Sequence, residues 1–221
     1  MLTQPQLEIL SATTDFVKSQ STGESSGQDW WHIYRVEKLA IFIAEKEEAE
    51  LFTIRLAALL HDLDDWKFNE SNSRNAENWL RSTSLEEETI QKVLHIISQV
   101  SFKGAGEKTI PDSMEAMIVQ DADRLDALGA IGIARAFAYG GSKNRPIFEP
   151  ETAPELHKTF TAYQNSKSHT INHFYEKLLL LKDRLHTKTA RDLAIERHDF
   201  MKDFLENFFE EWFLFGEKRF P

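Results

Sequence analysis

The stretch LFTIRLAALLHDLDD, residues 51–65, decides the fold of this chain. Its first part is apolar around much of a helical circumference, which predicts a helix buried on most sides and not an amphipathic surface helix. The apolar run ends in charge, because His61, Asp62, Asp64 and Asp65 follow it directly. Ionisable groups in such a setting are costly unless they are paired or bound to a metal. The segment therefore predicts a helical core with a polar site at one end of a buried helix.

Outside this segment, apolar residues recur at spacings of three and four, which predicts further helices. We expect them at residues 2–17, 30–43, 76–80, 90–97, 114–137, 174–185 and 193–212. Residues 114–137 are rich in alanine and glycine, and we expect this segment to form one central helix. Asp29 is expected to cap the helix that begins at Trp30, and residues 139–154 are expected to be irregular. Alternation with a period of two never persists, so the predicted fold class is all-α.

The composition excludes several classes of protein. The 221 residues include 36 Asp and Glu against 26 Lys and Arg, a net charge of −10. Nucleic acids and membrane surfaces are polyanionic and recruit basic faces, so we expect neither as a partner. Cysteine is absent, which excludes disulfides, thiolate metal ligands and a cysteine nucleophile and fits a reducing compartment. No apolar run reaches the roughly 18 residues of a transmembrane helix, and no signal pattern is visible. We expect a soluble, cytoplasmic protein.

A His-Asp pair is weak evidence for a metal site, because composition alone produces such pairs. The chain contains two of them. His198-Asp199 lies in a predicted amphipathic helix, where its polar side chains fit a solvated face. His61-Asp62, in contrast, closes the apolar run LAALL. We therefore expect the chemistry of the protein at His61 and Asp62.

Two other segments supply matching groups. The segment DWWHIYRV offers His32 on an otherwise aromatic and aliphatic helix, and residues 119–132 offer Asp121, Asp123 and Asp126. Two imidazoles and two carboxylates from three helices suit a first-row divalent ion such as Mn²⁺, Fe²⁺, Co²⁺ or Zn²⁺, and suit Mg²⁺ less well. Asp121 and Asp123 are about 200° apart around a helix, so both cannot easily face the same ion.

These segments resemble a known family. His32, the segment LLHDLDD and the segment ADRLDAL are similar to the H…HD…D pattern of the HD-domain metal-dependent phosphohydrolases. The longer segments DWWHIYRV, LLHDLDDWK, VQDADRLDALGAIGIARAF with YGG after it, and HFYEKLL resemble the YpgQ/YedJ-like branch of that family. The resemblance spans residues 29–200, so it is not confined to one short motif.

The resemblance implies an HD-domain helical bundle with a metal site between its central helices. It implies one domain over residues 1–221, with its core at 25–140 and C-terminal helices at 155–217 packed on it. In related domains the ligand aspartate typically follows an alanine and precedes an apolar residue by two positions. This pattern favours Asp123 as a ligand over Asp121, which stays the alternative. The implied metal ligands are His32, His61, Asp62 and Asp123, and the implied cofactor is a divalent ion, Mn²⁺ first, with Mg²⁺, Co²⁺, Ni²⁺, Fe²⁺ or Zn²⁺ as alternatives.

Catalytic and substrate-binding groups are expected beside these ligands. Asp65 matches an acidic position that related phosphohydrolases use near the attacking water, which implies a general base or a water-orienting group, with Asp64 as the alternative. Tyr139, before Gly140-Gly141, and His173 are further candidates for substrate contact. Phosphate contacts are expected from cations in the matching segments: Arg35, Lys67 and Arg124 first, then Arg135 and Lys177.

The implied activity is hydrolysis of a nucleoside triphosphate between the α and β phosphates, giving NMP or dNMP and pyrophosphate. A divalent ion with open positions can polarise a phosphoryl oxygen and activate water without a covalent intermediate. Two alternatives stay open: a nucleotide monophosphatase with the same site, and a non-catalytic metal-binding helical regulatory module. The expected partner is a nucleotide or another small-molecule phosphate ester, and the aromatic C-terminal helix offers an interface for a homodimer.

Overall fold

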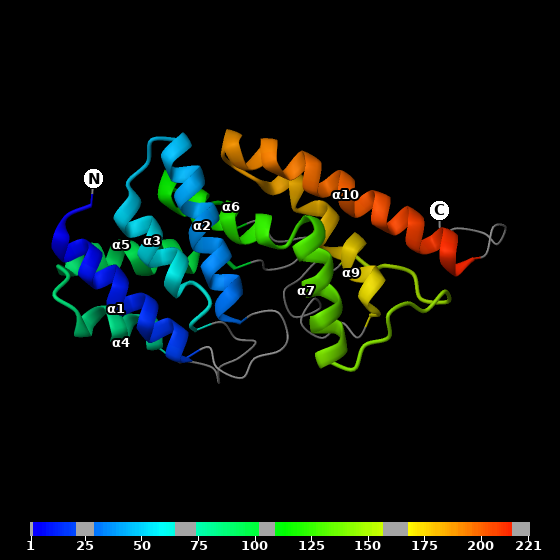
Figure 1. Ribbon diagram of the computed structural model, residues 1–221, viewed down its shortest axis with the longest axis horizontal. Coiled ribbons are helices and arrows are strands. Elements are labelled where there is room, and N and C mark those ends of the chain that lie inside the picture. Colours follow the sequence, from blue (N-terminus) through cyan, green and yellow to red (C-terminus); the bar gives the residue numbers. More distant parts are fainter. Residues whose placement is uncertain (1, 21–28, 65–73, 102–108, 157–167, 214–221) are drawn as a thin grey trace.

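The computed structural model describes residues 2–20, 29–64, 74–101, 109–156 and 168–213 (Figure 1). No strand occurs among these residues, which confirms the all-α class. The α-helices are α1 (Gln4–Gln20), α2 (Trp30–Lys46), α3 (Leu51–Leu60), α4 (Asn75–Ser82), α5 (Glu87–Ser98), α6 (Met114–Asp126), α7 (Gly129–Ser142), α9 (Thr170–Glu176) and α10 (Lys188–Trp212). Two short 3₁₀ helices are η1 (Leu178–Leu180) and η2 (Lys182–Arg184). None of the described helices is long and apolar enough to cross a membrane.

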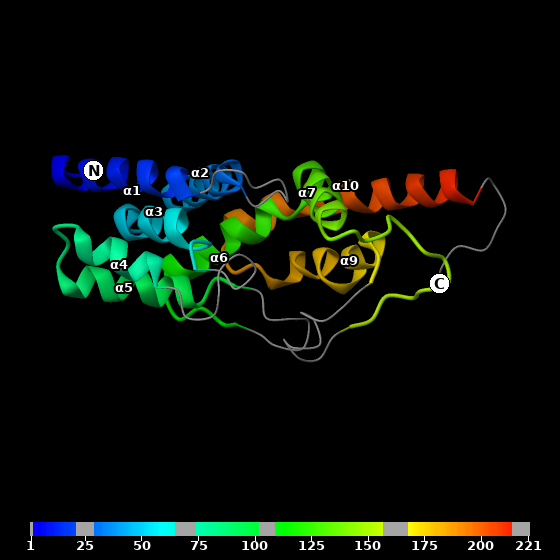
Figure 2. The same cartoon turned by 90° about the horizontal axis from the view of Figure 1, so that it is seen from below.

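Helix α3 lies at the centre of the N-terminal half. It packs against α1, α2, α5 and α6, and Figure 2 shows it between α1 and α2 on one side and α4 and α5 on the other. Ile54, Leu56, Leu59 and Leu60 have no exposed surface. Burial on opposite faces explains why the sequence of α3 lacks a polar stripe, and it confirms the prediction made from the apolar run. The C-terminal end of α3, at His61, is consequently also buried.

Side-chain caps determine where α2 and α3 begin. The carboxylate of Asp29 accepts a hydrogen bond from the backbone N–H of His32 at the start of α2, as predicted. The carboxylate of Glu50 accepts from the N–H groups of Phe52 and Thr53 at the start of α3. Such caps satisfy backbone donors that have no partner within the helix. As a result, His32 is placed in the first turn of α2.

The expected single helix over residues 114–137 is wrong, because the chain turns at Ala127 and Leu128 between α6 and α7. Gly129 has a φ of +73°, which an L side chain rarely adopts. A Cβ on Gly132 would lie 2.2 Å from the carbonyl oxygen of Ala127, so α7 can approach the end of α6 only because Gly132 has no side chain. The small residues of this segment allow a tight turn between the two helices α6 and α7.

Two further helix boundaries differ from expectation. Helix α7 continues through residues 139–142, which were expected to be irregular. The segment at 174–185 is divided into α9, η1 and η2. Lys177 has φ −139° and ψ −61°, so the backbone leaves the helical region between α9 and η1 although the apolar spacing continues. Helix α10 then packs on α6, α7 and α2, which brings the C-terminal part of the chain against the helices that carry the predicted ligands.

We expect Gly132→Ala to destabilise the protein by about 1–3 kcal/mol, because the added Cβ meets a backbone oxygen that cannot rotate away. Gly141→Ala in the same helix is the matched control. An added Cβ on Gly141 meets nothing within 4 Å, so its effect is the helix-propensity gain of up to about 1 kcal/mol. Urea denaturation of the two variants measures the difference. Equal midpoints would contradict the proposed role of Gly132 in the turn between α6 and α7.

Candidate metal centre

Four predicted ligand side chains from three helices meet at one point. His32 lies in the first turn of α2, His61 and Asp62 follow the last turn of α3, and Asp123 lies in α6. His32 Nε2 is 3.2 Å from Asp62 Oδ2 and 3.5 Å from Asp123 Oδ1. His61 Nε2 is 3.4 Å from Asp62 Oδ1 and 3.8 Å from Asp123 Oδ1. Donor atoms of His32, His61 and Asp123 lie within 4.8 Å of one another, which is a separation that one metal ion can bridge.

The two Nε2 atoms support a metal as the missing partner. Both are buried and lack a hydrogen-bond partner among the described residues. His32 is fully buried and His61 is 5% exposed. Buried polar atoms without a partner are rare and costly in native proteins. Two imidazole nitrogens facing two carboxylates form a donor set that a first-row divalent ion accepts, so the residues present fit the cofactor.

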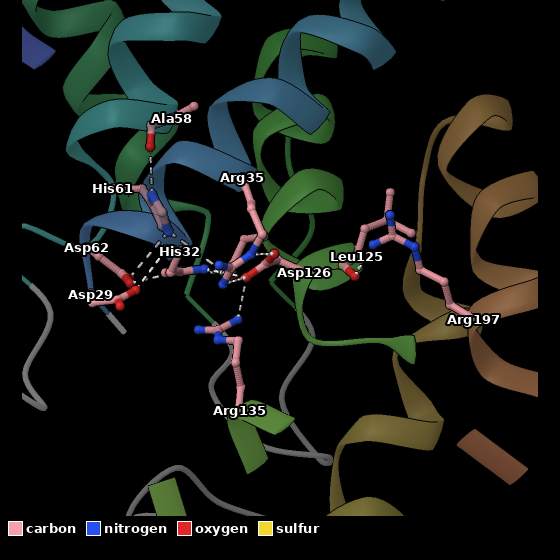
Figure 3. A network of polar contacts seen from close by, with 11 residues as sticks. Asp29, His32, Arg35, Ala58, His61, Asp62, Leu125, Asp126, Arg135 and Arg197 are labelled. Atoms are coloured by element: carbon pink, nitrogen blue, oxygen red, sulfur yellow. Dashed lines mark hydrogen bonds and ion pairs between the residues drawn. The ribbon is translucent and has the colours of Figure 1, made fainter. Parts of the chain in front are cut away.

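The second ring nitrogen of each histidine fixes the direction of the ring. His61 Nδ1 lies 2.9 Å from the carbonyl oxygen of Ala58, to which it can only donate. His32 Nδ1 lies 2.7 Å from Asp126 Oδ2. Figure 3 shows the two side chains pointing toward each other. With Nδ1 used as a donor in both rings, each Nε2 faces the site and can present a lone pair to a metal ion that displaces a proton. Partners of this kind orient metal-ligating histidines and increase their basicity.

Asp126, which the sequence offered beside Asp121 and Asp123 but which was assigned no role, organises this side of the centre. It is 2% exposed and holds three side chains at once. Arg35 contributes two hydrogen bonds, from Nε at 2.7 Å and from Nη2 at 3.0 Å. Arg135 donates from Nη1 at 2.9 Å. Its spacing was the available signal, because Asp126 lies one helical turn after Asp123 and so shares its face of α6.

The charges at the centre influence one another strongly. Burial opposes a charge on His61, but the carboxylates of Asp62 and Asp123 outweigh it and raise the pKa of His61 to about 9. Burial also opposes ionisation of Asp126, but hydrogen bonds from His32 and Arg35 lower its pKa to about 2. The pKa of Asp123 is lowered as well, mainly by its interaction with His61 against the effect of burial. The pocket of carboxylates thus attracts a cation, and a metal ion would compete with a proton on His61.

Asp121, the alternative ligand, lies elsewhere. Its carboxylate accepts hydrogen bonds from the backbone N–H groups of His186 and Thr187 and from the Thr187 hydroxyl. Arg124, predicted to contact phosphate, is 5% exposed and donates to the carbonyl oxygen of Arg184. Asp121 and Arg124 are three residues apart and share the face of α6 that packs under the start of α10. The structure therefore places Asp121 against the backbone just before α10, whose side-chain cap is Thr187, and Arg124 against the carbonyl oxygen of Arg184.

The other predicted site residues are dispersed. Asp64 caps α4, because its carboxylate accepts from the N–H groups of Asn75 and Ala76. Tyr139 lies within α7 and not in a loop, and the cations of Lys143 and Arg145 lie 5.7 Å and 5.6 Å from the centre of its ring.

Four predictions remain as they were made. His173 is half-buried in α9 and Lys177 follows the end of that helix, and their contacts with substrate stay predictions. Asp65 and Lys67 lie outside the described residues.

We expect Asp123→Asn to weaken divalent-metal binding by more than about 100-fold, because a ligand contributes more than the outer-sphere partners whose loss costs 10- to 100-fold. Asp121→Asn is the matched control on the same helix. It is expected to keep its metal but to lower the free energy of unfolding by about 2 kcal/mol, since three donors lose an anionic acceptor. Metal content after dialysis and thermal denaturation measure the two effects. Loss of metal in Asp121→Asn alone would reverse the assignment.

Comparison with known proteins agrees with this geometry. The family model described as "HD domain" matches residues 30–128, which include all four predicted ligands. A protein of Bacillus subtilis (strain 168), described as "Uncharacterized protein YpgQ", is 43% identical over 194 residues, covering 86% of this chain and 87% of that protein.

Solved structures are similar over almost the whole chain. A protein from Lactobacillus plantarum matches with a TM-score of 0.87 and 35% identity, covering 97% of this chain and 100% of that chain. The crystal structure of Bacillus subtilis YpgQ in complex with ADP matches with a TM-score of 0.75 and 37% identity, covering 94% and 96%. An HD-superfamily hydrolase from Bacillus thuringiensis matches with a TM-score of 0.71 and 42% identity, covering 94% and 98%. The chain belongs to the HD-domain family and is a metal-dependent hydrolase of the HD superfamily.

Proposed function

We propose that the protein is a divalent-metal phosphohydrolase that cleaves nucleoside triphosphates between the α and β phosphates. The products are NMP or dNMP and pyrophosphate. The observation that carries the proposal is the convergence, at the end of α3, of two buried Nε2 atoms on two carboxylates; among the described residues neither Nε2 atom has a hydrogen-bond partner. A relative with a similar fold has been crystallised with ADP, which supports a nucleotide as the substrate class.

In this proposal His32, His61, Asp62 and Asp123 hold the ion. A divalent ion bound there would supply Lewis-acid chemistry for hydrolysis of the anhydride bond between the α and β phosphates. Mn²⁺ is our first choice of metal because the donor set combines imidazole nitrogens with carboxylate oxygens. Co²⁺, Ni²⁺, Fe²⁺ and Zn²⁺ also accept such mixed ligands, whereas Mg²⁺ prefers oxygen ligands alone. Ala58 and Asp126 keep both imidazole rings in the orientation that this set requires.

Asp65 is our candidate for the group that accepts a proton from the attacking water. Asp64, the alternative, already accepts two backbone hydrogen bonds at the start of α4. For the phosphates of the substrate we propose Arg35 and Arg135, together with Lys67. Arg35 and Arg135 already hold Asp126 and lie beside the ligand His32.

The first test is a product assay by phosphorus NMR with nucleoside triphosphates and monophosphates in the presence of Mn²⁺. We expect NMP and pyrophosphate in equal amounts, and we expect His61→Ala to abolish turnover because one metal ligand is lost. Orthophosphate released from monophosphates would instead assign a nucleotidase using the same site. Metal binding without turnover of any phosphate ester would favour a regulatory module.

The second test separates catalysis from metal binding. Asp65→Ala is expected to retain the metal but to lower kcat by at least about 100-fold, which is the usual contribution of a general base. Asp64→Ala is the control. It removes a helix cap and should reduce stability by about 1 kcal/mol while leaving kcat of the folded enzyme nearly unchanged. Normal kcat in Asp65→Ala would remove Asp65 from the mechanism.

A further inference from the structure

A cavity of about 460 Å³ lies between α2, the corner that joins α6 to α7, and α10. Its volume is within the range of about 300–1,000 Å³ that is typical of small-molecule sites. The walls include the apolar side chains of Leu39, Leu128 and Ile131 and the ring of Tyr34. None of these residues was singled out by the sequence, and none contributes to the metal centre.

Positive charge is concentrated around this cavity. Arg35, Lys38 and Arg197 line it, whereas Asp126 is the only acidic residue among its lining residues in the described part of the chain. The carboxylate of Asp126 is already shared between His32, Arg35 and Arg135. In a chain with a net charge of −10, a local excess of cations requires an explanation. It favours an anionic ligand, because fixed charges of one sign attract the other.

The backbone at the start of α7 also favours an anionic ligand in this cavity. Gly129, Ala130 and Ile131 form the first turn of α7 and line the cavity. The residue before them, Leu128, provides no side-chain cap. First-turn N–H groups without partners, together with the helix dipole, favour a phosphate or carboxylate nearby.

None of the four proposed metal ligands is among the described residues that line the cavity. The ligand atoms meet at the Nε2 side of the His32 ring, whereas Asp126 and Arg35 lie at its Nδ1 side, as the contacts in Figure 3 show. A phosphate held by the metal ligands and an anion in the cavity would thus occupy different places. Their connection is the chain of hydrogen bonds from Arg35 through Asp126 to His32.

We propose that this cavity is a second ligand site, which binds a phosphate-bearing anion of nucleotide size. Lys38 and Arg197 supply the positive charge for its phosphate, and Tyr34, Leu39 and Ile131 contact its apolar or aromatic part. The site goes beyond the proposed reaction and does not depend on it. Occupancy of the site would act on Arg35, and through Asp126 it would influence the position of the ligand His32.

Isothermal titration calorimetry with adenosine 5′-monophosphate as the probe tests the site. The titrations use the His61→Ala protein and, in parallel, the wild-type protein with EDTA. In both samples the metal centre lacks its metal and cannot hold the phosphate through it. Two samples are used so that a folding defect in His61→Ala does not decide the result. We expect saturable binding in both. Adenosine, which lacks the phosphate, should not bind, and ribose 5-phosphate, which lacks the base, should bind more weakly.

Ala130→Glu and Ala134→Glu provide the charge-matched pair on α7. Both residues are exposed, but only Ala130 lines the cavity. Ala130→Glu should weaken binding of the probe by at least about tenfold through like-charge repulsion, whereas Ala134→Glu should leave it unchanged. The first-turn position favours a carboxylate for helix stability, so Ala130→Glu should fold normally. Lys38→Gln should also weaken binding of the probe, because it removes a positive charge from the lining of the cavity.

Three results would overturn the proposal. One is the absence of binding at millimolar probe in both the His61→Ala protein and the EDTA-treated protein. Another is equal affinity in Ala130→Glu and Ala134→Glu. The third is binding of adenosine as tight as that of its monophosphate, because the site would then not recognise the anion.

Discussion

The hydrogen bond between His32 and Asp126 is the interaction on which the rest of the centre depends. A fully buried imidazole can adopt several orientations, and only one of them presents Nε2 to His61, Asp62 and Asp123. The 2.7 Å contact at Nδ1 selects that orientation and fixes the tautomer. Asp126 can remain ionised in the interior because Arg35 and Arg135 also bind it. Asp126, Arg35 and Arg135 thus hold the ligand His32 in place without being proposed metal ligands themselves.

A second constraint is the burial of α3. A helix that packs against neighbours on opposite faces cannot place its polar residues on an outer stripe, so they gather at its end. His61 and Asp62 are at that end because the apolar run stops there. The cost of burying ionisable groups is offset by their mutual attraction, which is visible in the raised pKa of His61. The fold and the site therefore arise from the same segment.

The sequence alone predicted the all-α class, the buried α3, the Asp29 cap and the grouping of His32, His61, Asp62 and Asp123. The fold class, the buried helix, the cap and the candidates His32, His61 and Asp62 follow from local patterns, namely periodicity and the contrast between polar residues and an apolar setting. The choice of Asp123 over Asp121 followed instead from the resemblance to the HD-domain family. The sequence could not predict the corner at Gly129, because alanine and glycine are compatible both with one long helix and with two helices in close contact.

Contacts between residues that are distant in the sequence could not be predicted from the sequence either. Asp121 differs from Asp123 through its hydrogen bonds to residues 186 and 187, which are distant in sequence. Arg124 was assigned to phosphate from its position beside a ligand, but its side chain is turned towards Arg184. Adjacent residues of a helix point in directions about 100° apart, so a residue next to a ligand does not share the face of that ligand. A test of spacing by helical turns would have grouped Asp126 with Asp123, and Arg124 with Asp121.

Helix α10 carries no metal ligand, yet it is attached to α6 at two points. Asp121 binds the backbone at the start of α10, and Arg197 donates a 2.6 Å hydrogen bond to the carbonyl oxygen of Leu125. Residues 30–128, which match the family model, therefore contain every proposed ligand but not the groups that hold the ligand-bearing helix α6 in place. A protein cut to those residues would leave a buried carboxylate and a helix end without their partners. We therefore expect the smallest unit that folds with an intact metal centre to be larger than the segment that matches the family model.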